Sequence, residues 1–114
     1  MEELLKTLVH TILSEKTEEE KAKALELLMS NSARALIEKV SENITEEQQA
    51  QLDMIEEDAI TLSDVANIFG IDNIREKMTE AVVEQAGLFI DENAELVNDE
   101  KIQVIETLVS QLQA

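Results

Sequence analysis

Apolar residues recur along most of this chain at intervals of three and four positions, the spacing that places side chains on one face of an α-helix. The first stripe, from Leu4 to Leu13, predicts a helix over residues 2–14. Later stripes predict helices that begin after residue 17, after a polar break at residues 30–32, after residue 45, near residue 63, at residue 72 and after residue 98. The pattern predicts a compact all-α bundle of about six or seven short helices.

Polar residues suited to capping stand where several of these helices should begin. Thr17 and Thr45 are followed three residues later by Glu20 and Gln48, which is the spacing of a capping box. The other expected caps are Ser63, Asp72 and Asn98. Acidic residues in a first turn also favour a helix start, because they complement the helix dipole. Part of the negative charge therefore has a structural use. The helix after residue 45 is expected to reach Ala59.

Composition agrees with one helical domain over residues 1–114. The sequence is 44% hydrophobic and contains no Pro and only two Gly, so residues that interrupt helices are scarce. Aliphatic side chains supply almost the whole core, and the only rings, Phe69 and Phe89, are expected to be buried. Because the chain has no Cys, disulfides and thiolate metal sites are excluded.

Two features of the sequence favour a cytoplasmic protein. The first residues lack the basic start and the apolar stretch of a signal peptide. The longest apolar run, residues 86–90, is far shorter than the roughly 20 residues that a membrane helix needs. We therefore expect no membrane association.

The segment at residues 61–82 has the pattern of either a helix-turn-helix or a plain corner between two packed helices. Gly70 can adopt the positive φ that ends the first helix. Ile71 can then fill the corner, and Asp72 can cap the second helix. The shape alone does not separate the two interpretations.

Charge separates the two interpretations of that segment. A DNA-reading second helix would present Asn73, Arg75 and Lys77 to the bases. The segment, however, holds four acids and two cations, a net charge of −2. It lacks the excess of Lys and Arg that supplies most affinity for phosphate. We expect a structural corner, and DNA binding through residues 61–82 is the alternative.

Enzyme and metal chemistry find little support. Signatures of phosphate-binding loops, zinc proteases and serine hydrolases are missing. The carboxylates of Asp53, Glu56, Glu57 and Asp58 have no aromatic or cationic neighbours in sequence and are expected on a solvated face. His10, the only histidine, has no second ligand at i+3 or i+4 and is expected on the surface. We expect no enzyme activity, no cofactor and no metal.

The most unusual property is the net charge of −17, which is unevenly spread. Residues 1–39 hold eight acids and six cations, whereas residues 40–114 hold eighteen acids and three cations. Between Val40 and Ile74 there is no Lys or Arg. The candidate binding residues in this acidic segment are Glu42, Glu46, Glu47, Asp53, Glu56, Glu57, Asp58, Asp64 and Asp72.

Such a charge distribution repels nucleic acid and anionic membranes and attracts basic protein surfaces. We expect a non-enzymatic protein-binding module whose partner is a basic protein surface. A sharper version, based on analogy of charge, is an inhibitor that competes with nucleic acid for a groove on its target. A third interpretation is a structural or oligomeric helical protein whose acidity only maintains solubility. The sequence leaves open whether the protein forms homo-oligomers.

Overall fold

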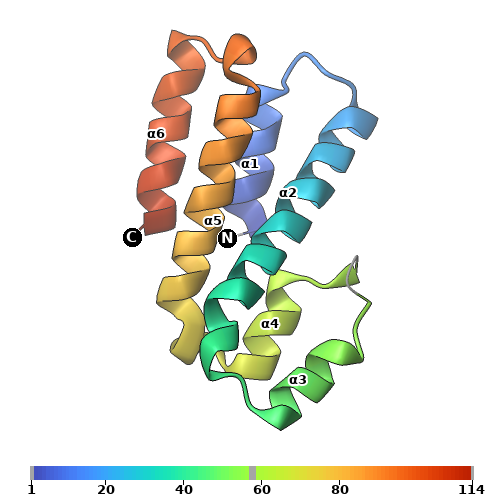
Figure 1. Cartoon of the computed structure of the whole chain (residues 1–114). Helices are drawn as coiled ribbons and strands as arrows, with labels where there is room; N and C mark the ends of the chain where they lie inside the picture. Colours follow the sequence, from blue (N-terminus) through green and yellow to red (C-terminus); the bar gives the residue numbers. More distant parts are fainter. Residues whose placement is uncertain (1, 57–58, 114) are drawn as a thin grey trace.

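Two long helices, α2 (Glu18–Val40) and α5 (Ile71–Glu92), run through the whole molecule and carry the shorter ones (Figure 1). The computed structural model describes residues 2–56 and 59–113, and within these ranges it contains six α-helices and no strand. The shorter elements are α1 (Glu2–Ile12), the 3₁₀ turn η1 (Ser41–Asn43), α3 (Glu46–Asp53), α4 (Leu62–Phe69), the 3₁₀ turn η3 (Ala94–Leu96) and α6 (Asp99–Gln113). The predicted all-α bundle is confirmed.

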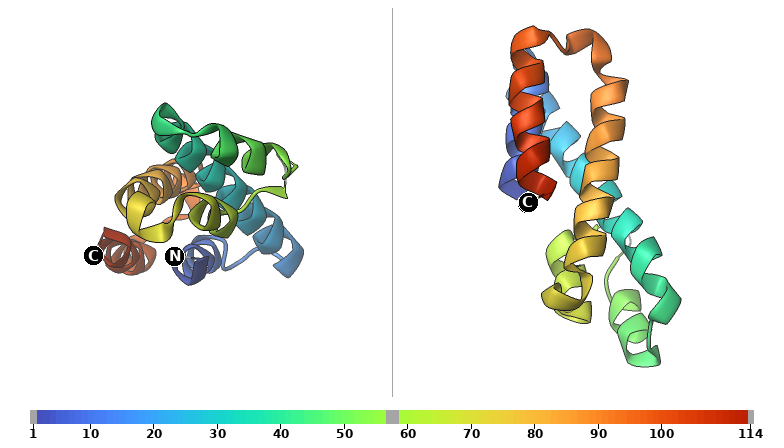
Figure 2. Two further views of the ribbon diagram at one scale, coloured as in Figure 1. Left: turned by 90° about the horizontal axis from the view of Figure 1, so that it is seen from below. Right: turned by 90° about the vertical axis from the view of Figure 1, so that its left-hand side faces the viewer.

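The shorter helices gather around the two long ones in two groups. At one end, α1 and α6 lie beside α2 and α5 and form four roughly aligned helices (Figures 1 and 2). At the other end, α4 packs against both α2 and α5, and α3 packs mainly against α4. The acidic segment thus builds one end of an elongated molecule of 47 × 29 × 19 Å.

The core is aliphatic, as the composition predicts. In α1, a single face formed by Leu5, Leu8, Val9 and Ile12 is fully buried. Small side chains are buried on both long helices, including Ala33 of α2 and Ala81 of α5, and α2 and α5 share the largest helix–helix interface. Small residues on each helix allow two backbones to approach closely. The sum of these contacts fixes the two long helices against each other.

The two aromatic rings differ in burial. Phe69, at the end of α4, is buried as expected, with 9% of its surface exposed. Phe89, on α5, is only half-buried and packs against the edge of the core. The expectation is therefore confirmed for Phe69 but not for Phe89.

The expected break at residues 30–32 is wrong, because α2 continues through it without interruption. Ser32 is fully buried, and its hydroxyl donates a hydrogen bond to the carbonyl oxygen of Leu28 at 2.8 Å. A serine whose hydroxyl is satisfied within its own helix can be buried at little cost. Packing of this stretch against α5 and α4 outweighs the modest helix propensity of Ser and Asn.

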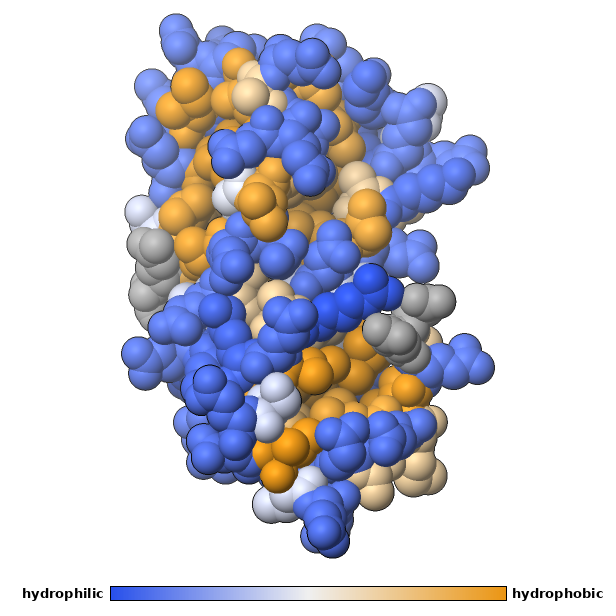
Figure 3. All heavy atoms as spheres, in the orientation of Figure 1, coloured by the Kyte–Doolittle hydropathy of each residue, from blue (hydrophilic) through white to orange (hydrophobic). Residues whose placement is uncertain are grey.

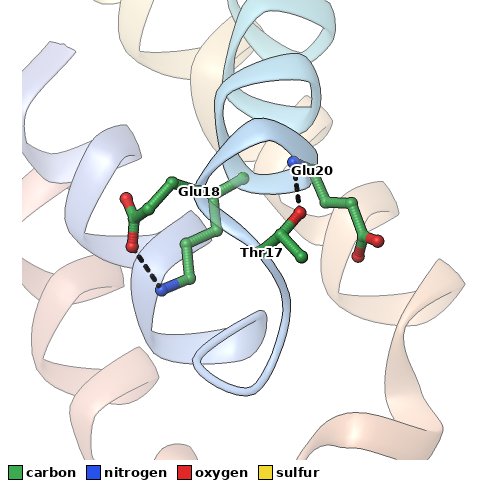
Figure 4. A network of polar contacts seen from close by, with 4 residues as sticks. Thr17, Glu18 and Glu20 are labelled. Carbon is green, nitrogen blue, oxygen red and sulfur yellow. Dashed lines mark hydrogen bonds and ion pairs between the residues drawn. The ribbon is translucent and has the colours of Figure 1, made fainter.

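Three of the predicted helix starts are confirmed. The Thr17 hydroxyl accepts a hydrogen bond from the Glu20 amide at 3.1 Å, beside an ion pair between Glu18 and Lys21 (Figure 4). Thr45 and Gln48 form the complete capping box at the start of α3. The Asn98 side chain accepts from the amide of Lys101 at the start of α6. Local side chains therefore determine where these helices begin.

Two other predictions about helix ends are wrong. The helix that begins after Thr45 ends at Asp53 instead of reaching Ala59. Only Leu52 of this helix is buried, so little tertiary packing is present to extend it. The cap of α4 is Thr61, not Ser63, because Thr61 forms a reciprocal capping box with Asp64. This earlier start brings Leu62 into the helix and buries it.

The corner between α4 and α5 is tighter than the sequence predicts. Gly70 alone separates the two helices, and its φ of +84° confirms the expected positive value. Asp72 does not cap α5, since the helix already begins at Ile71 and has no side-chain cap. Ile71 does not fill the corner and is 43% exposed. The Asn73 side chain instead donates to the Phe69 carbonyl oxygen at 3.0 Å and closes the end of α4.

The two glycines should respond oppositely to alanine. Gly70→Ala should lower the free energy of unfolding by about 1–3 kcal/mol, because other residues are strained at this φ and the new methyl would lie 3.1 Å from the Asn73 side-chain nitrogen. Gly87→Ala should raise it by about 0.5–1 kcal/mol, because Gly87 lies exposed within α5 with nothing within 4 Å of its added methyl. Urea unfolding followed by circular dichroism measures both. Equal effects would contradict the geometry of the corner.

Candidate protein-binding surface

The acidic segment folds into η1, α3, α4 and the start of α5, which lie together at the lower end of the molecule in Figure 1. Five of its nine candidate residues have exposed side chains and belong to η1, α3 or the turn after α3. We call this group the acidic end: Glu42, Glu46, Glu47, Asp53 and Glu56. Glu57 and Asp58 lie outside the described residues.

The other two candidates have partners in the fold. The half-buried Asp64 accepts a hydrogen bond from the Thr61 amide at 3.0 Å, as part of the cap of α4. Asp72 is exposed on the first turn of α5 and forms an ion pair with Arg75 at 3.2 Å. Asp64 is therefore accounted for by local structure, whereas Asp72 remains on the surface.

The acidic end is poorly neutralised. Within residues 2–56 and 59–113, no Lys or Arg forms an ion pair with Glu42, Glu46, Glu47 or Glu56. Glu46 and Glu47 lie in the first turn of α3, where they complement the helix dipole. Glu42 and Glu56 have no such position. The charge of this surface therefore faces solvent.

The gap in cations between residues 40 and 74 does not persist in space. The end of α2 brings Lys39 to this end of the molecule, and the first turns of α5 bring Arg75 and Lys77. All three are engaged: Lys39 pairs with Glu84 at 3.3 Å, Arg75 pairs with Asp72, and the Lys77 ammonium donates to the Lys39 carbonyl oxygen at 3.1 Å. They do not pair with the acidic end.

Lys77 and Lys101 act as long-range caps of helix ends. Lys77 reaches from α5 to a carbonyl in the last turn of α2. Lys101 reaches from α6 to the Ile12 carbonyl that ends α1 and to the Leu96 carbonyl of η3, both at 3.0 Å. Cations at helix C-termini satisfy unpaired carbonyls and interact favourably with the helix dipole. Two of the three cations in residues 40–114 thus hold the bundle together.

A second acidic surface extends along α5 and was missed by the sequence analysis. Asp72 is the first of four exposed acids spaced four residues apart on this helix, and a shallow depression follows them. We call them the acidic row: Asp72, Glu76, Glu80 and Glu84. The i, i+4 spacing is visible in the sequence, but Glu76, Glu80 and Glu84 lie beyond the segment without cations, which ends before Arg75. Neighbouring like charges at this spacing destabilise a helix.

The corner at residues 61–82 presents few free polar groups. Asn73 and Lys77 donate to backbone carbonyls, and Arg75 pairs with Asp72. These are the three side chains that a DNA-reading helix would use. In this fold each of them has a partner within the protein.

Neither a metal cluster nor a membrane-spanning helix occurs in the described part of the chain. No group of three or more His, Asp or Glu side chains there could hold a metal ion. Likewise, no helix in these ranges is both long and apolar enough to cross a bilayer. His10 is half-buried on α1, between the polar side chains of Thr7 and Thr11 and near Glu3 and Lys6.

Comparison with known proteins yields no relative. No protein-family model matches this chain, and neither a curated protein nor a solved structure is significantly similar to it.

Removing the Lys77 cap should destabilise the fold. Lys77→Met keeps the apolar stem but leaves the Lys39 carbonyl without its charged donor, so the free energy of unfolding should fall by about 1.5–3 kcal/mol. Lys23→Met is the control, since Lys23 pairs with Glu19 on an exposed face and its loss should cost at most about 0.5 kcal/mol. Urea unfolding measures both variants. Because each removes one cation, an effect of total charge would lower the free energy of unfolding equally in the two.

Reversing one charge within the acidic row should stabilise the protein. Glu80→Lys makes the repulsive i±4 neighbours Glu76 and Glu84 attractive, which outweighs the new like charge at i−3, Lys77. The free energy of unfolding should rise by about 0.5–1 kcal/mol at low salt. Glu106→Lys changes the net charge equally at an exposed position of α6 with no charged residue four positions away. Thermal and urea unfolding at two salt concentrations compare them. A gain for Glu106→Lys as large as that for Glu80→Lys would show that the row has no local effect.

Proposed function

We propose that this chain is a non-enzymatic binding module whose acidic end docks against a basic protein surface. The observation that carries the proposal is the set of exposed carboxylates on η1, α3 and the following turn that have no cation partner among the described residues. Lys and Arg side chains of a partner are the groups that would neutralise them. The acidic row on α5 offers a second contact for the same partner.

The energetic cost of these charges supports the proposal. A row of like charges at i, i+4 spacing weakens its helix by about 0.2–0.5 kcal/mol per pair. Ion pairs at its two ends, Asp72 with Arg75 and Glu84 with Lys39, offset only part of this cost. Glu76 and Glu80 lie between them and form no ion pair among the described residues. These charges do not stabilise the bundle, whereas a role in binding would account for them.

Electrostatics would act mainly on the rate of association. Oriented negative charge steers a basic partner toward the acidic end and accelerates encounter. The effect extends over about 8 Å at physiological salt and weakens as salt is added. A groove that otherwise binds nucleic-acid phosphates is the sharpest form of such a partner, and the protein would then act as a competitor of nucleic acid.

A pair of charge-reversal variants tests the proposal. The first carries Glu42→Lys, Glu46→Lys and Glu47→Lys at the acidic end. The second carries Glu2→Lys, Glu3→Lys and Glu15→Lys in the near-neutral first third of the chain. The two variants are matched, because each places two lysines in the first turn of a helix, α3 or α1. Their net charges are equal.

Each protein is immobilised, and host proteins retained on it are eluted with a salt gradient and identified. We expect the wild type and the Glu2/Glu3/Glu15 variant to retain the same basic protein, and the acidic-end variant to lose it. The rate at which the retained basic protein associates with the wild type should fall steeply as ionic strength rises. Retention lost equally in both variants would mean that only total charge matters. No specifically retained basic protein would leave acidity as a means of solubility and overturn the proposal.

A further inference from the structure

An apolar cleft of about 300 Å³ separates the second half of α2 from α3. Its apolar lining consists of Ile37, Ile44, Leu52, Ile55 and Ile60. Leu52 and Ile60 form buried parts of the lining, whereas the three other isoleucines are half-buried and remain reachable from solvent. Figure 3 shows orange surface in the lower half of the molecule, in the region of α2 and α3 and framed by blue side chains.

The packing of α3 explains why the cleft is open. This helix packs mainly against α4, and Leu52 is its only buried side chain. It begins with the local capping box of Thr45 and Gln48 and has few tertiary contacts beyond α4. The side of α3 toward α2 therefore leaves isoleucines uncovered. Met54, at the end of α3, adds a flexible apolar side chain that is 85% exposed.

The charges around the cleft restrict what can cover it. Glu38 lines it, Glu42 follows Ser41 of its rim, and Asp53 and Glu56 flank the Met54–Ile55 pair. Among the described residues of the lining, Arg34 is the one cation. A second copy of this chain would bring further negative charge to an acidic surface, and an anionic membrane or nucleic acid would be repelled as well. The complementary occupant is a protein segment with apolar side chains between Lys or Arg residues.

We infer that the α2–α3 cleft is the docking site for a basic amphipathic helix of the partner. An amphipathic helix inserts apolar side chains at i, i+3, i+4 and i+7 into such a groove, and its remaining positions can carry the cations. Ile37, Ile44 and Ile55 contact the apolar face, and carboxylates of the acidic end meet the flanking cations. The inference rests on the proposed function and adds to it the shape of the ligand and an apolar anchor site.

The test uses a synthetic probe and needs no identified partner. A fluorescent Leu/Lys peptide about four helical turns long, with one apolar face, is compared with a scrambled peptide of the same composition. We expect the amphipathic peptide to bind the wild type at least about tenfold more tightly than the scrambled one. In ¹H–¹⁵N spectra of the wild type, it should shift the amides of residues 34–56 and 60 most strongly.

Two double variants locate the anchor. Ile37→Ser with Ile55→Ser should weaken binding of the amphipathic peptide about tenfold. Leu27→Ser with Leu88→Ser is the control, because both leucines are more than half exposed and neither lines the cleft, so binding should be unchanged. Circular dichroism shows whether each variant is folded. If the cleft variant is unfolded, the amide shifts of the wild type decide.

The outcomes separate the inference from the proposed function. One outcome is that the two peptides bind equally, with binding that is lost in high salt and unaffected by the isoleucine changes. This result would overturn the inference that the cleft is a docking site and would leave the acidic-end proposal standing. Strongest shifts outside residues 34–56 and 60, or no binding of the amphipathic peptide, would also overturn the inference that the cleft is the docking site. The proposed function fails separately, when the two charge-reversal variants behave alike.

Discussion

The packing of α2 against α5 is the interaction on which the rest of the structure depends. Both helices exceed twenty residues, they share the largest helix–helix interface, and each buries small side chains, among them Ala33 and Ala81. α1 and α4 pack on α2, while α4 and α6 pack on α5. α6 packs more on α1 than on α5, and α3 packs mainly on α4. Loss of the central pair would leave α1 packed mainly on α6 and α4 packed mainly on α3.

The distribution of the few cations links the fold to the surface. The chain has 26 acids and nine Lys and Arg residues, and in residues 40–114 only three cations are available. Lys77 and Lys101 are bound to carbonyl oxygens at or near the ends of α2 and α1. Cations used in this way satisfy backbone groups that would otherwise lack donors. They are therefore not positioned to neutralise the exposed carboxylates of α3. The same use of these lysines stabilises the helix ends and leaves the surface negatively charged.

The end formed by η1 and α3 contributes least to the core. In α3 only Leu52 is buried, and the helix is specified by its capping box and by acids in its first turn. A helix that supplies little core surface can use its other positions for contacts with a partner without a large loss of stability. Carboxylates and uncovered isoleucines occur together there. This combination suits a ligand that is both basic and apolar, which a uniformly charged surface would not select.

Much of the fold was determined by the sequence alone, because it depends on local interactions. The absence of Pro, the scarcity of Gly and the periodic aliphatic residues specify helices, and the caps at Thr17, Thr45 and Asn98 act on amides within three residues. The positive φ at Gly70 could likewise be predicted from its place between two helical patterns.

Tertiary structure decided the features that depend on distant segments. Packing against α5 and α4 keeps α2 helical through the buried Ser32, where local propensity predicts a break. Lys77 and Lys39 are 38 residues apart, and Lys101 and Ile12 are 89 apart, so no local pattern reveals their bonds. The α2–α3 cleft has the same origin. The cleft exists because α3 packs on α4. The sequence shows which residues are apolar, but it does not show which of them α3 will leave uncovered.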